Sequence, residues 1–457
     1  MQKALLVKAV FVALIFAVLL IPLSMIHGIV LERAARQQAV AQEIAASSFN
    51  KQIFAGPILS LPYTEEYTEE IDEGREKRIV NRRLERTLHL FPTTSELDGT
   101  ASVGEKHRGL FKVRTFNWQA NVRGDFALDG TVKIKRTRDD SRIVWGEPVI
   151  SLGLSDPRGL VGAPTLEWAG QSIALARGSG VSSIASGVHA ITTPVDPAQP
   201  QHLPFLLVIS LQGTESLGIV PVADNNRVSL RSDWQHPSFG GQFLPQPESQ
   251  RISKDGFATQ WTVTSLASNA QQQIQGMLEG KKEGLLSVER LEIGFIEPID
   301  IYSLSDRALK YAFLFIGLTF VCFLLFEVLK RLPIHPAQYG FVGLALAMFF
   351  LLLFALSEHI AFLFAYLIAA AGCIAVLGSY LGAVLHGVTR GVSFSIMLTT
   401  LYSALYGLLV SEDNALLLGS LLVFTLIATV MLLTRNVDWY RVGAPETDSP
   451  RQRVAES

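Results

Sequence analysis

The C-terminal part of the chain is an almost continuous apolar region that runs from Leu309 to Thr434. Short polar breaks divide this region into segments of similar length. The segments comprise residues 309–329, 339–357, 360–384, 391–410 and 415–434. Each is close to the roughly 20 residues that an α-helix needs to cross the hydrocarbon core of a bilayer. We therefore expect five membrane-spanning helices in this region.

A sixth apolar segment lies near the N-terminus, from Ala9 to about Ile26. It is long enough to span a bilayer, but a cleavable signal peptide has a similar composition. The stretch IPLSMIHGIVLERA, with which it ends, lacks the small-x-small pattern of a cleavage site. We therefore interpret the segment as a retained membrane anchor. The share of charged residues, 18% against roughly 25% in soluble globular proteins, also favours a membrane protein.

A polar triplet, Ser357-Glu358-His359, interrupts the apolar run between residues 339 and 384. It is either a buried catalytic cluster or a turn at the membrane surface. The run is too long for one crossing and suits two, and charged groups at the bilayer centre are strongly unfavourable. The sequence also supplies no third catalytic partner and no pair of oxyanion donors. We therefore expect the triplet in a tight outer turn between two helices.

The loops between the six expected spans differ in charge from one side of the membrane to the other. If the spans alternate in direction, the loops on one side contain Glu358, His359, Glu412 and Asp413. The flanks on the other side contain Lys3, Lys8, Lys330, Arg331, Arg390, Arg435 and Arg441. By the positive-inside rule, both termini are predicted to be cytoplasmic and residues 31–305 periplasmic.

The long middle part of the chain has the pattern of a β domain. Residues 31–52 continue the anchor as a helix, and short alternating runs separated by Gly, Pro, Asp and Asn then follow up to about Asp300. We predict a mainly antiparallel β domain of roughly 250 residues, which is enough for a proper core. The predicted fold class is a polytopic α-helical membrane protein of six transmembrane helices, one plus five, with this periplasmic domain inserted between helices 1 and 2.

The expected domains follow from these segments. They are residues 1–30, the cytoplasmic N-terminus and first helix; 31–305, the periplasmic domain with its helical stalk; 306–434, the five-helix transmembrane domain; and 435–457, a cytoplasmic tail.

Composition excludes several kinds of chemistry. Both cysteines, Cys322 and Cys373, lie in the apolar region, so the β domain has neither a disulfide nor a cysteine-based zinc site. A net charge of −2 without a long basic run argues against nucleic-acid binding. Residues 65–86 pass from an acidic to a basic run. This change of charge is typical of a charged, solvent-facing hairpin. The alternative is a calcium or phosphate site, but the spacing matches no calcium-binding loop. We predict no catalytic residues, no cofactor and no metal.

The stretch SDWQHPSFGGQFLPQP, residues 232–247, is the most unusual of the middle part. Aromatic rings on a loop shaped by Gly and Pro could stack on a sugar or hold a peptide. The alternative is that the rings pack into the domain core. A single histidine without a second His or Cys nearby is a weak metal ligand. The candidate binding residues are Trp234, His236, Pro237, Phe239 and Phe243.

Three further features have simpler explanations. The Gly/Ser-rich residues 176–191 contain no phosphate-binding motif and are interpreted as a flexible loop. Glu327 lies three and four positions before Lys330 and Arg331, so we expect a local ion pair there. The span 391–410 carries several hydroxyl groups, which either line a pathway or let helices pack closely.

Several stretches resemble the CreD family of bacterial inner-membrane proteins. They are IPLSMIHGIVLERA, WQHPSFGGQFLP, LSDRALKYAFLFIGLTF, IHPAQYGFVGLALAMFFLLLFALSEH and LTRNVDWY. The resemblance runs from the first helix through Tyr440. It implies a protein of the cytoplasmic membrane associated with cell-envelope integrity, in an envelope-stress or metabolic regulon governed by a two-component system. It carries over no catalytic residues.

Three functions follow as hypotheses. The leading one is a non-enzymatic envelope component, held in the lipid bilayer, whose periplasmic domain binds an envelope protein or glycan. The alternative is a transporter or flippase built from the five clustered helices. The third is an envelope hydrolase that uses His236 or the region of Ser357, although the sequence shows no catalytic constellation. The oligomeric state is left open.

Overall fold

A computed structural model of the chain describes residues 2–47, 49–73, 76–109, 111–132, 134–181, 183–280, 284–295, 301–330, 335–384, 387–411 and 414–435. The chain divides into two compact units. Met1–Arg36 and Ile299–Ser457 form the helical unit, and Gln37–Pro298 form the β unit.

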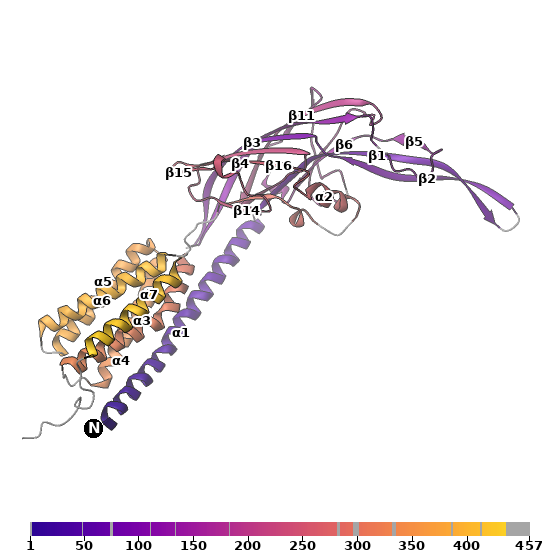
Figure 1. Ribbon diagram of the computed structural model, residues 1–457. Coiled ribbons are helices and arrows are strands. Elements are labelled where there is room, and N and C mark those ends of the chain that lie inside the picture. Colours follow the sequence, from indigo (N-terminus) through magenta and orange to yellow (C-terminus); the bar gives the residue numbers. More distant parts are fainter. Residues whose placement is uncertain are drawn as a thin grey trace, which may run out of the picture. The chain divides into compact units, whose positions relative to one another are not determined.

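Apolar helices make up the helical unit (Figure 1). They are α1 (Gln2–Ser47), α3 (Ile301–Lys330), α4 (Pro336–Ser357), α5 (Phe362–Val384), α6 (Val388–Val410) and α7 (Ala415–Thr434). Within the described residues, five of these helices are long and apolar enough to cross a membrane, and α7 coincides with the remaining predicted span. The predicted order of one apolar helix, a β domain and a group of apolar helices is confirmed, as is the extension of the first helix beyond its apolar part.

Part of the argument for orientation lies outside the described residues. Arg331, Glu412, Asp413 and the predicted tail from residue 436 onwards are among them, and so are the side chains of Lys3, Lys8 and Lys330. The cytoplasmic position of the termini therefore stays a prediction.

Rings and small residues hold the helical unit together. Tyr402 of α6 lies with its ring centroid 4.7 Å from that of Phe315 and 4.6 Å from that of Phe349. Helices α5 and α6 approach each other closely where glycines meet, since a Cβ atom on Gly391 would lie 2.7 Å from the carbonyl oxygen of Gly378. Small residues allow such close approach of helices in a membrane.

The β unit consists of two sheets. Sheet A has the strand order β14 (Ser238–Gly241), β17 (Leu291–Gly294), β12 (Ser216–Val220), β1 (Gln52–Glu73), β6 (Val149–Leu154), β10 (Gly187–Ile191) and β9 (Ala176–Arg177); β2 (Glu76–Leu90) and β5 (Arg142–Trp145) pair with β1. Sheet B has the order β15 (Arg251–Ser253), β16 (Gly256–Thr264), β13 (Asn225–Ser232), β3 (Thr94–Arg108), β4 (Phe111–Asp129), β11 (Pro200–Thr214), β7 (Thr165–Trp168) and β8 (Gln171–Ile173).

The pairing is mainly antiparallel, as predicted. The parallel exceptions among the described pairs are β1 with β12 and β3 with β13. Short helices complete the β unit: α2 (Ala270–Leu278) and the 3₁₀ turns η1 (Pro157–Gly159), η2 (Pro247–Ser249) and η3 (Leu285–Ser287).

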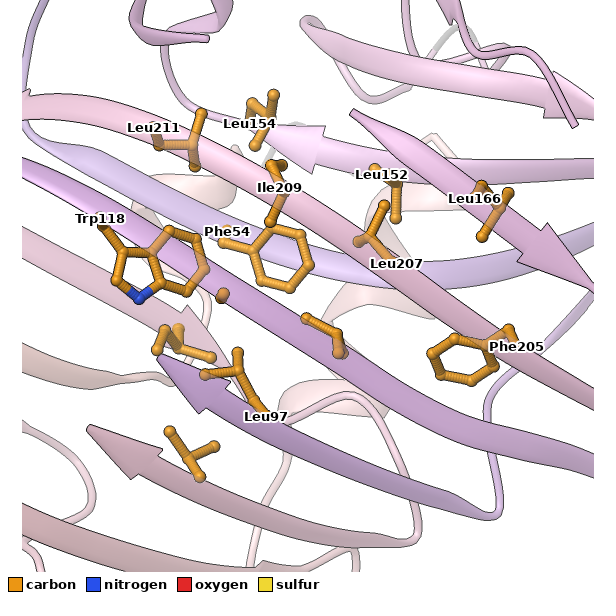
Figure 2. Packing of buried hydrophobic residues seen from close by; sticks show 14 of the residues in the cluster. Phe54, Leu97, Trp118, Leu152, Leu154, Leu166, Phe205, Leu207, Ile209 and Leu211 are labelled. Carbon is orange, nitrogen blue, oxygen red and sulfur yellow. The ribbon is translucent and has the colours of Figure 1, made fainter. Parts of the chain in front are cut away.

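The core lies between the two sheets, because strands such as β4 alternate buried and exposed side chains. Trp118 of β4 packs on Phe54 of β1, with ring centroids 5.8 Å apart (Figure 2). The other face of sheet A is covered by α2, whose Ile274 and Met277 are buried against strands β1 and β12. On the other face of sheet B, charged side chains such as Glu96, Arg123 and Arg227 are exposed.

Candidate functional site

The open face of sheet B contains a groove of about 740 Å³, which we call the sheet B groove. Alternation along the strands turns every second side chain towards this face. The strand register then places Glu96 of β3 opposite both Arg123 of β4 and Arg227 of β13. The result is a row of alternating charges across three neighbouring strands.

The charges in this row form exposed ion pairs. Arg123 Nη2 lies 2.9 Å from Glu96 Oε2, and Arg227 Nη1 lies 3.7 Å from Glu96 Oε1. A second pair joins Arg231 Nη2 to Asp98 Oδ1 at 3.2 Å. Exposed ion pairs stabilise a protein by at most about 1 kcal/mol, so these guanidinium groups can turn to a ligand at little energetic cost.

The rim of the groove is formed by η2 and β15. Ser249 accepts a hydrogen bond from the backbone N–H of Gln260 at 3.1 Å, which holds η2 against β16. Arg251 of β15 also lines the groove, and within the described residues it has no ion pair. The lining thus contains four arginines against Glu96, Asp98 and Glu248. Such a surface matches ligands that carry carboxylate groups beside neutral polar groups.

The predicted binding loop lies partly in the core. Phe239 belongs to β14 and packs edge-on against Phe257 and Trp261, with both centroid distances 5.7 Å. Phe243 is half-buried against the same core cluster. For these two rings, the structure supports the packing interpretation rather than an exposed aromatic platform.

Trp234 is half-buried and also packs against this core cluster. Trp234 donates a hydrogen bond from Nε1 to the carbonyl oxygen of His236 at 2.7 Å, and the guanidinium of Arg114 lies 4.8 Å from the centre of the Trp234 ring. His236 is exposed, and Pro237 is half-buried. Binding by this loop stays a prediction.

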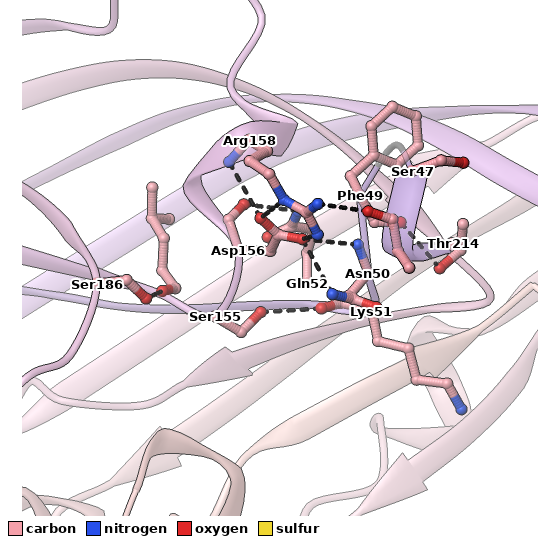
Figure 3. Close-up of polar contacts among 12 residues, drawn as sticks. Ser47, Phe49, Asn50, Lys51, Gln52, Ser155, Asp156, Arg158, Ser186 and Thr214 are labelled. Carbon is pink, nitrogen blue, oxygen red and sulfur yellow. Dashed lines mark hydrogen bonds and ion pairs between the residues drawn. The ribbon is translucent and has the colours of Figure 1, made fainter. Parts of the chain in front are cut away.

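A polar joint at the end of α1 was not predicted from the sequence (Figure 3). Asp156 accepts hydrogen bonds from the backbone N–H of Asn50 at 3.0 Å and from Arg158 Nη2 at 2.6 Å. Arg158 also donates to the carbonyl oxygen of Ala46, in the last turn of α1, at 2.7 Å. Helix ends leave carbonyl groups without partners, and here an arginine provides one. Fully buried Gln52 donates to the carbonyl oxygen of Asp156 at 3.0 Å and so completes the joint.

The pKa values of Asp156 and Arg158 are shifted in the directions that these contacts predict. Burial alone would raise the pKa of Asp156, but the hydrogen bonds from Arg158 and Asn50 outweigh burial and lower that pKa below its ordinary value. The same contacts raise the pKa of Arg158. Both groups are therefore charged at neutral pH, which makes the joint a fixed ion pair.

The charged hairpin predicted over residues 65–86 is confirmed as strands β1 and β2, with residues 74 and 75 outside the described part. One of its acids is not solvent-facing, which corrects the prediction. Glu65 is fully buried and accepts hydrogen bonds from the backbone N–H groups of Thr137 and Arg138. Burial would raise its pKa, but hydrogen bonds from Ser141, Thr137 and Arg138 lower it to about 2. Glu65 therefore anchors the loop before β5 to the hairpin.

The Ser357-Glu358-His359 triplet lies where α4 ends and the turn to α5 begins, as predicted. Glu358 is nearly buried, lies 3.9 Å from Arg33 of α1, and accepts a hydrogen bond from Tyr302 of α3 at 3.3 Å. The turn therefore connects three helices through one carboxylate, a role for which the sequence held no local signal.

Polar groups elsewhere in the helical unit also have partners. His27 of α1 lies 2.8 Å from Asp306 of α3. Glu327 accepts a hydrogen bond from the hydroxyl group of Tyr339 at 2.7 Å, so it connects two helices; its expected partners Lys330 and Arg331 have side chains outside the described part.

The hydroxyl groups of α6 bond mostly to their own helix. Thr399, Thr400 and Ser403 each donate to a backbone carbonyl oxygen four residues earlier. Tyr402 is buried, and its hydroxyl group donates to Cys373 Sγ at 3.1 Å. Tyr402 therefore takes part in packing between helices, as the packing interpretation expects, whereas Thr399, Thr400 and Ser403 are exposed. Within the part of the chain that the structure describes, no three His, Cys, Asp or Glu residues are grouped as metal ligands would be.

Comparison with solved structures gives only weak likeness. An M1 zinc metallopeptidase from Deinococcus radiodurans aligns over 45% of this chain and 42% of its own, with 8% identity and a TM-score of 0.19. Further M1 zinc metallopeptidase structures give a TM-score of 0.18.

Comparison of sequences is decisive. "Inner membrane protein CreD" from Escherichia coli (strain K12) is 33% identical over 428 residues, which cover 94% of this chain and 92% of that protein. A family model described as "Inner membrane protein CreD" matches residues 4–440. The resemblance seen in the quoted stretches is thereby confirmed, and the chain belongs to the CreD family of inner membrane proteins.

Proposed function

We propose that this inner membrane protein contributes to cell-envelope integrity or the envelope stress response without catalysing a reaction. In this proposal the helices anchor the chain in the bilayer, and the β unit lies in the periplasm and binds an envelope component. The basic flanks of the predicted spans support the periplasmic placement.

The observation that carries the proposal is the sheet B groove. The strand register places Arg123 and Arg227 on either side of Glu96. The planar guanidinium group of arginine can bind a carboxylate through two parallel hydrogen bonds. Asn121, Ser229 and Gln260 line the same groove and offer partners for hydroxyl and amide groups. The ligand class that fits these groups is an envelope glycan that carries carboxylates.

Site-specific crosslinking in living cells tests the groove. A photo-crosslinking amino acid at Ser229 is expected to capture glycan-containing material. The same amino acid at Ile191, which is 54% exposed on β10 and outside the groove, is the matched control. Equal labelling from both positions would contradict the proposal. A third position at Trp234 tests whether the predicted loop takes part in the same contact.

Charge reversal provides an independent test. The double variant Arg123→Glu and Arg227→Glu should fail to restore resistance to detergent in cells that lack the protein, because it places carboxylates where the ligand's carboxylates would bind. Arg142→Glu on β5, exposed and outside the groove, should restore it fully. Restoration by both variants would exclude the groove.

The absence of catalysis is itself a proposal. Purified full-length protein in detergent should leave envelope glycans and peptides uncleaved over many hours. Turnover that is abolished by the His236→Ala and His359→Ala variant would instead establish the hydrolase hypothesis.

A further inference from the structure

Strand β2 has a long open edge. It pairs with β1 from Glu76 to Leu90 and, within the described residues, with no other strand. The strands that end the two sheets are much shorter, since β14 and β5 have 4 residues, β15 and β8 have 3, and β9 has 2. An open edge offers unpaired N–H and C=O groups to another extended chain.

The outer half of the hairpin is a ribbon of two strands only. Pairing with β5 ends at Glu66 and Arg142, and beyond that point β1 pairs only with β2 in the described part. Figure 1 shows this ribbon projecting beyond the other strands of the β unit. A two-stranded ribbon is marginally stable in water unless a further strand or a helix packs on it. Ile79, opposite Glu70 in this ribbon, is 66% exposed, so the ribbon also leaves apolar contact area uncovered.

The charge on β2 selects the kind of partner. From Ile79 to Leu90 the strand carries Arg82, Arg83 and Arg86 against a single acid, Glu85. Arg82 and Arg83 pair with Glu69 and Glu66 of β1 at 2.9 and 3.0 Å, yet their side chains remain 50% and 78% exposed. Each guanidinium group has five N–H donors, so it can bind a second carboxylate on its open side.

A second copy of the chain fits this edge poorly. Antiparallel pairing of two β2 strands would place arginines opposite or diagonal to arginines, and like charges at these positions destabilise a sheet. An acidic strand would instead place its carboxylates within reach of Arg82 and Arg83. We propose that the open edge of β2 is the docking site for an acidic, extended segment of another protein, which adds a strand to sheet A.

This inference is independent of the sheet B groove, because it concerns a protein partner and another surface. The probe is a fluorescent peptide of repeating Glu-Glu-Thr-Thr, which presents carboxylates on both faces of a strand and so can reach the adjacent Arg82 and Arg83. A peptide of repeating Lys-Lys-Thr-Thr is its counterpart. Binding to the full-length protein in detergent is followed by fluorescence anisotropy. The acidic peptide is expected to bind and to bind more weakly at higher salt, and the basic peptide is expected not to bind.

Two variants separate the partner's contacts from those within the hairpin. The variant Arg82→Gln with Arg83→Gln and the variant Glu66→Gln with Glu69→Gln break the same two ion pairs. Only the first removes charge from the edge strand. It should bind the acidic peptide about tenfold more weakly, whereas the second should bind at least as tightly as the unaltered protein. Equal affinities of the two variants for the acidic peptide would show that Arg82 and Arg83 only prevent aggregation at the edge and do not bind a partner. That result would overturn the proposal.

Hydrogen exchange tests the added strand itself. The acidic peptide should slow exchange of backbone amides of β2 and leave that of β16, on the other sheet, unchanged. Binding without protection of β2 would show an electrostatic contact without strand pairing and would contradict the proposed mode. No binding of the acidic peptide would overturn the docking site altogether.

Discussion

Replacing Asp156 by Asn tests the joint between α1 and the sheets. Asp156 Oδ2 accepts from the backbone N–H of Asn50 at 3.0 Å and from the side-chain amide of Asn50 at 3.1 Å. Its other oxygen accepts from Arg158 Nε at 2.9 Å. An asparagine amide, in either orientation, replaces one of these acceptors by a donor, so one donor is left facing another.

The structure sets the size of the effect. Leaving one largely buried donor unpaired costs about 1–3 kcal/mol. The lost ion pair adds at most about 1 kcal/mol, because the Arg158 side chain is half-exposed. The free energy of unfolding of the β unit should therefore fall by about 1–4 kcal/mol. For a domain of this size, that corresponds to a midpoint at least about 2 °C lower.

Tryptophan fluorescence during heating is a suitable assay, because the β unit contains Trp118, Trp145, Trp168, Trp234 and Trp261, five of the six tryptophans of the chain. The matched control is Asp140→Asn, whose side chain is 72% exposed and pairs only with nearby Arg138 in the described part. The control should melt close to the unaltered protein. If Asp156→Asn melts within about 1 °C of the control, the reasoning about the joint is wrong.

Three further predictions follow from single contacts. The pKa of Glu65 is about 2 in the folded protein, against an ordinary 4.5, so the stability it contributes is complete above pH 4.5 and is lost as the pH falls through 2. Glu65→Gln should flatten this part of the curve of stability against pH, measured by fluorescence. An unchanged curve would contradict the prediction. Gly99→Ala should destabilise the β unit by about 1–3 kcal/mol in the same assay, because the added Cβ atom would lie 2.6 Å from Nε1 of buried Trp118. An unaltered midpoint of thermal unfolding would show that the Trp118 ring can move. Tyr402→Leu should lower stability by about 2 kcal/mol because it opens a cavity, whereas Thr399→Val should change stability by less than about 0.5 kcal/mol. Heating in detergent followed by size-exclusion chromatography compares the two variants. Equal losses of stability would argue against the packing interpretation of α6.

The architecture could be predicted because its signals are local. The thickness of the membrane sets the number of apolar residues that a crossing helix needs, and each segment can be compared with that number. The triplet at residues 357–359 divides a run that is too long for one crossing. The alternation of apolar and polar residues along stretches such as residues 109–128 is also a local signal, because successive side chains of a strand point to opposite faces of a sheet. The parallel pairing of β1 with β12 and of β3 with β13 has no such local signature. It depends on which distant strands become neighbours.

The sites were harder to predict than the fold. Asn50 and Asp156 are 106 positions apart in sequence, and each alone is an ordinary polar residue next to a turn. The sheet B groove combines strands β3, β4 and β13, and its only local signal in residues 94–108 is the pair of acids Glu96 and Asp98, two positions apart. Aromatic content drew attention to residues 232–247, yet the rings of Trp234, Phe239 and Phe243 pack against the core. Composition identifies unusual segments, whereas register and packing decide which side chains remain accessible.

The placement of sulfur has a consequence for biogenesis. Both thiols belong to α3 and α5, so every contact that stabilises the β unit is noncovalent. A sandwich of this size buries enough surface to fold without crosslinks. Its folding is consequently independent of redox conditions, and it needs neither an oxidase nor a disulfide isomerase.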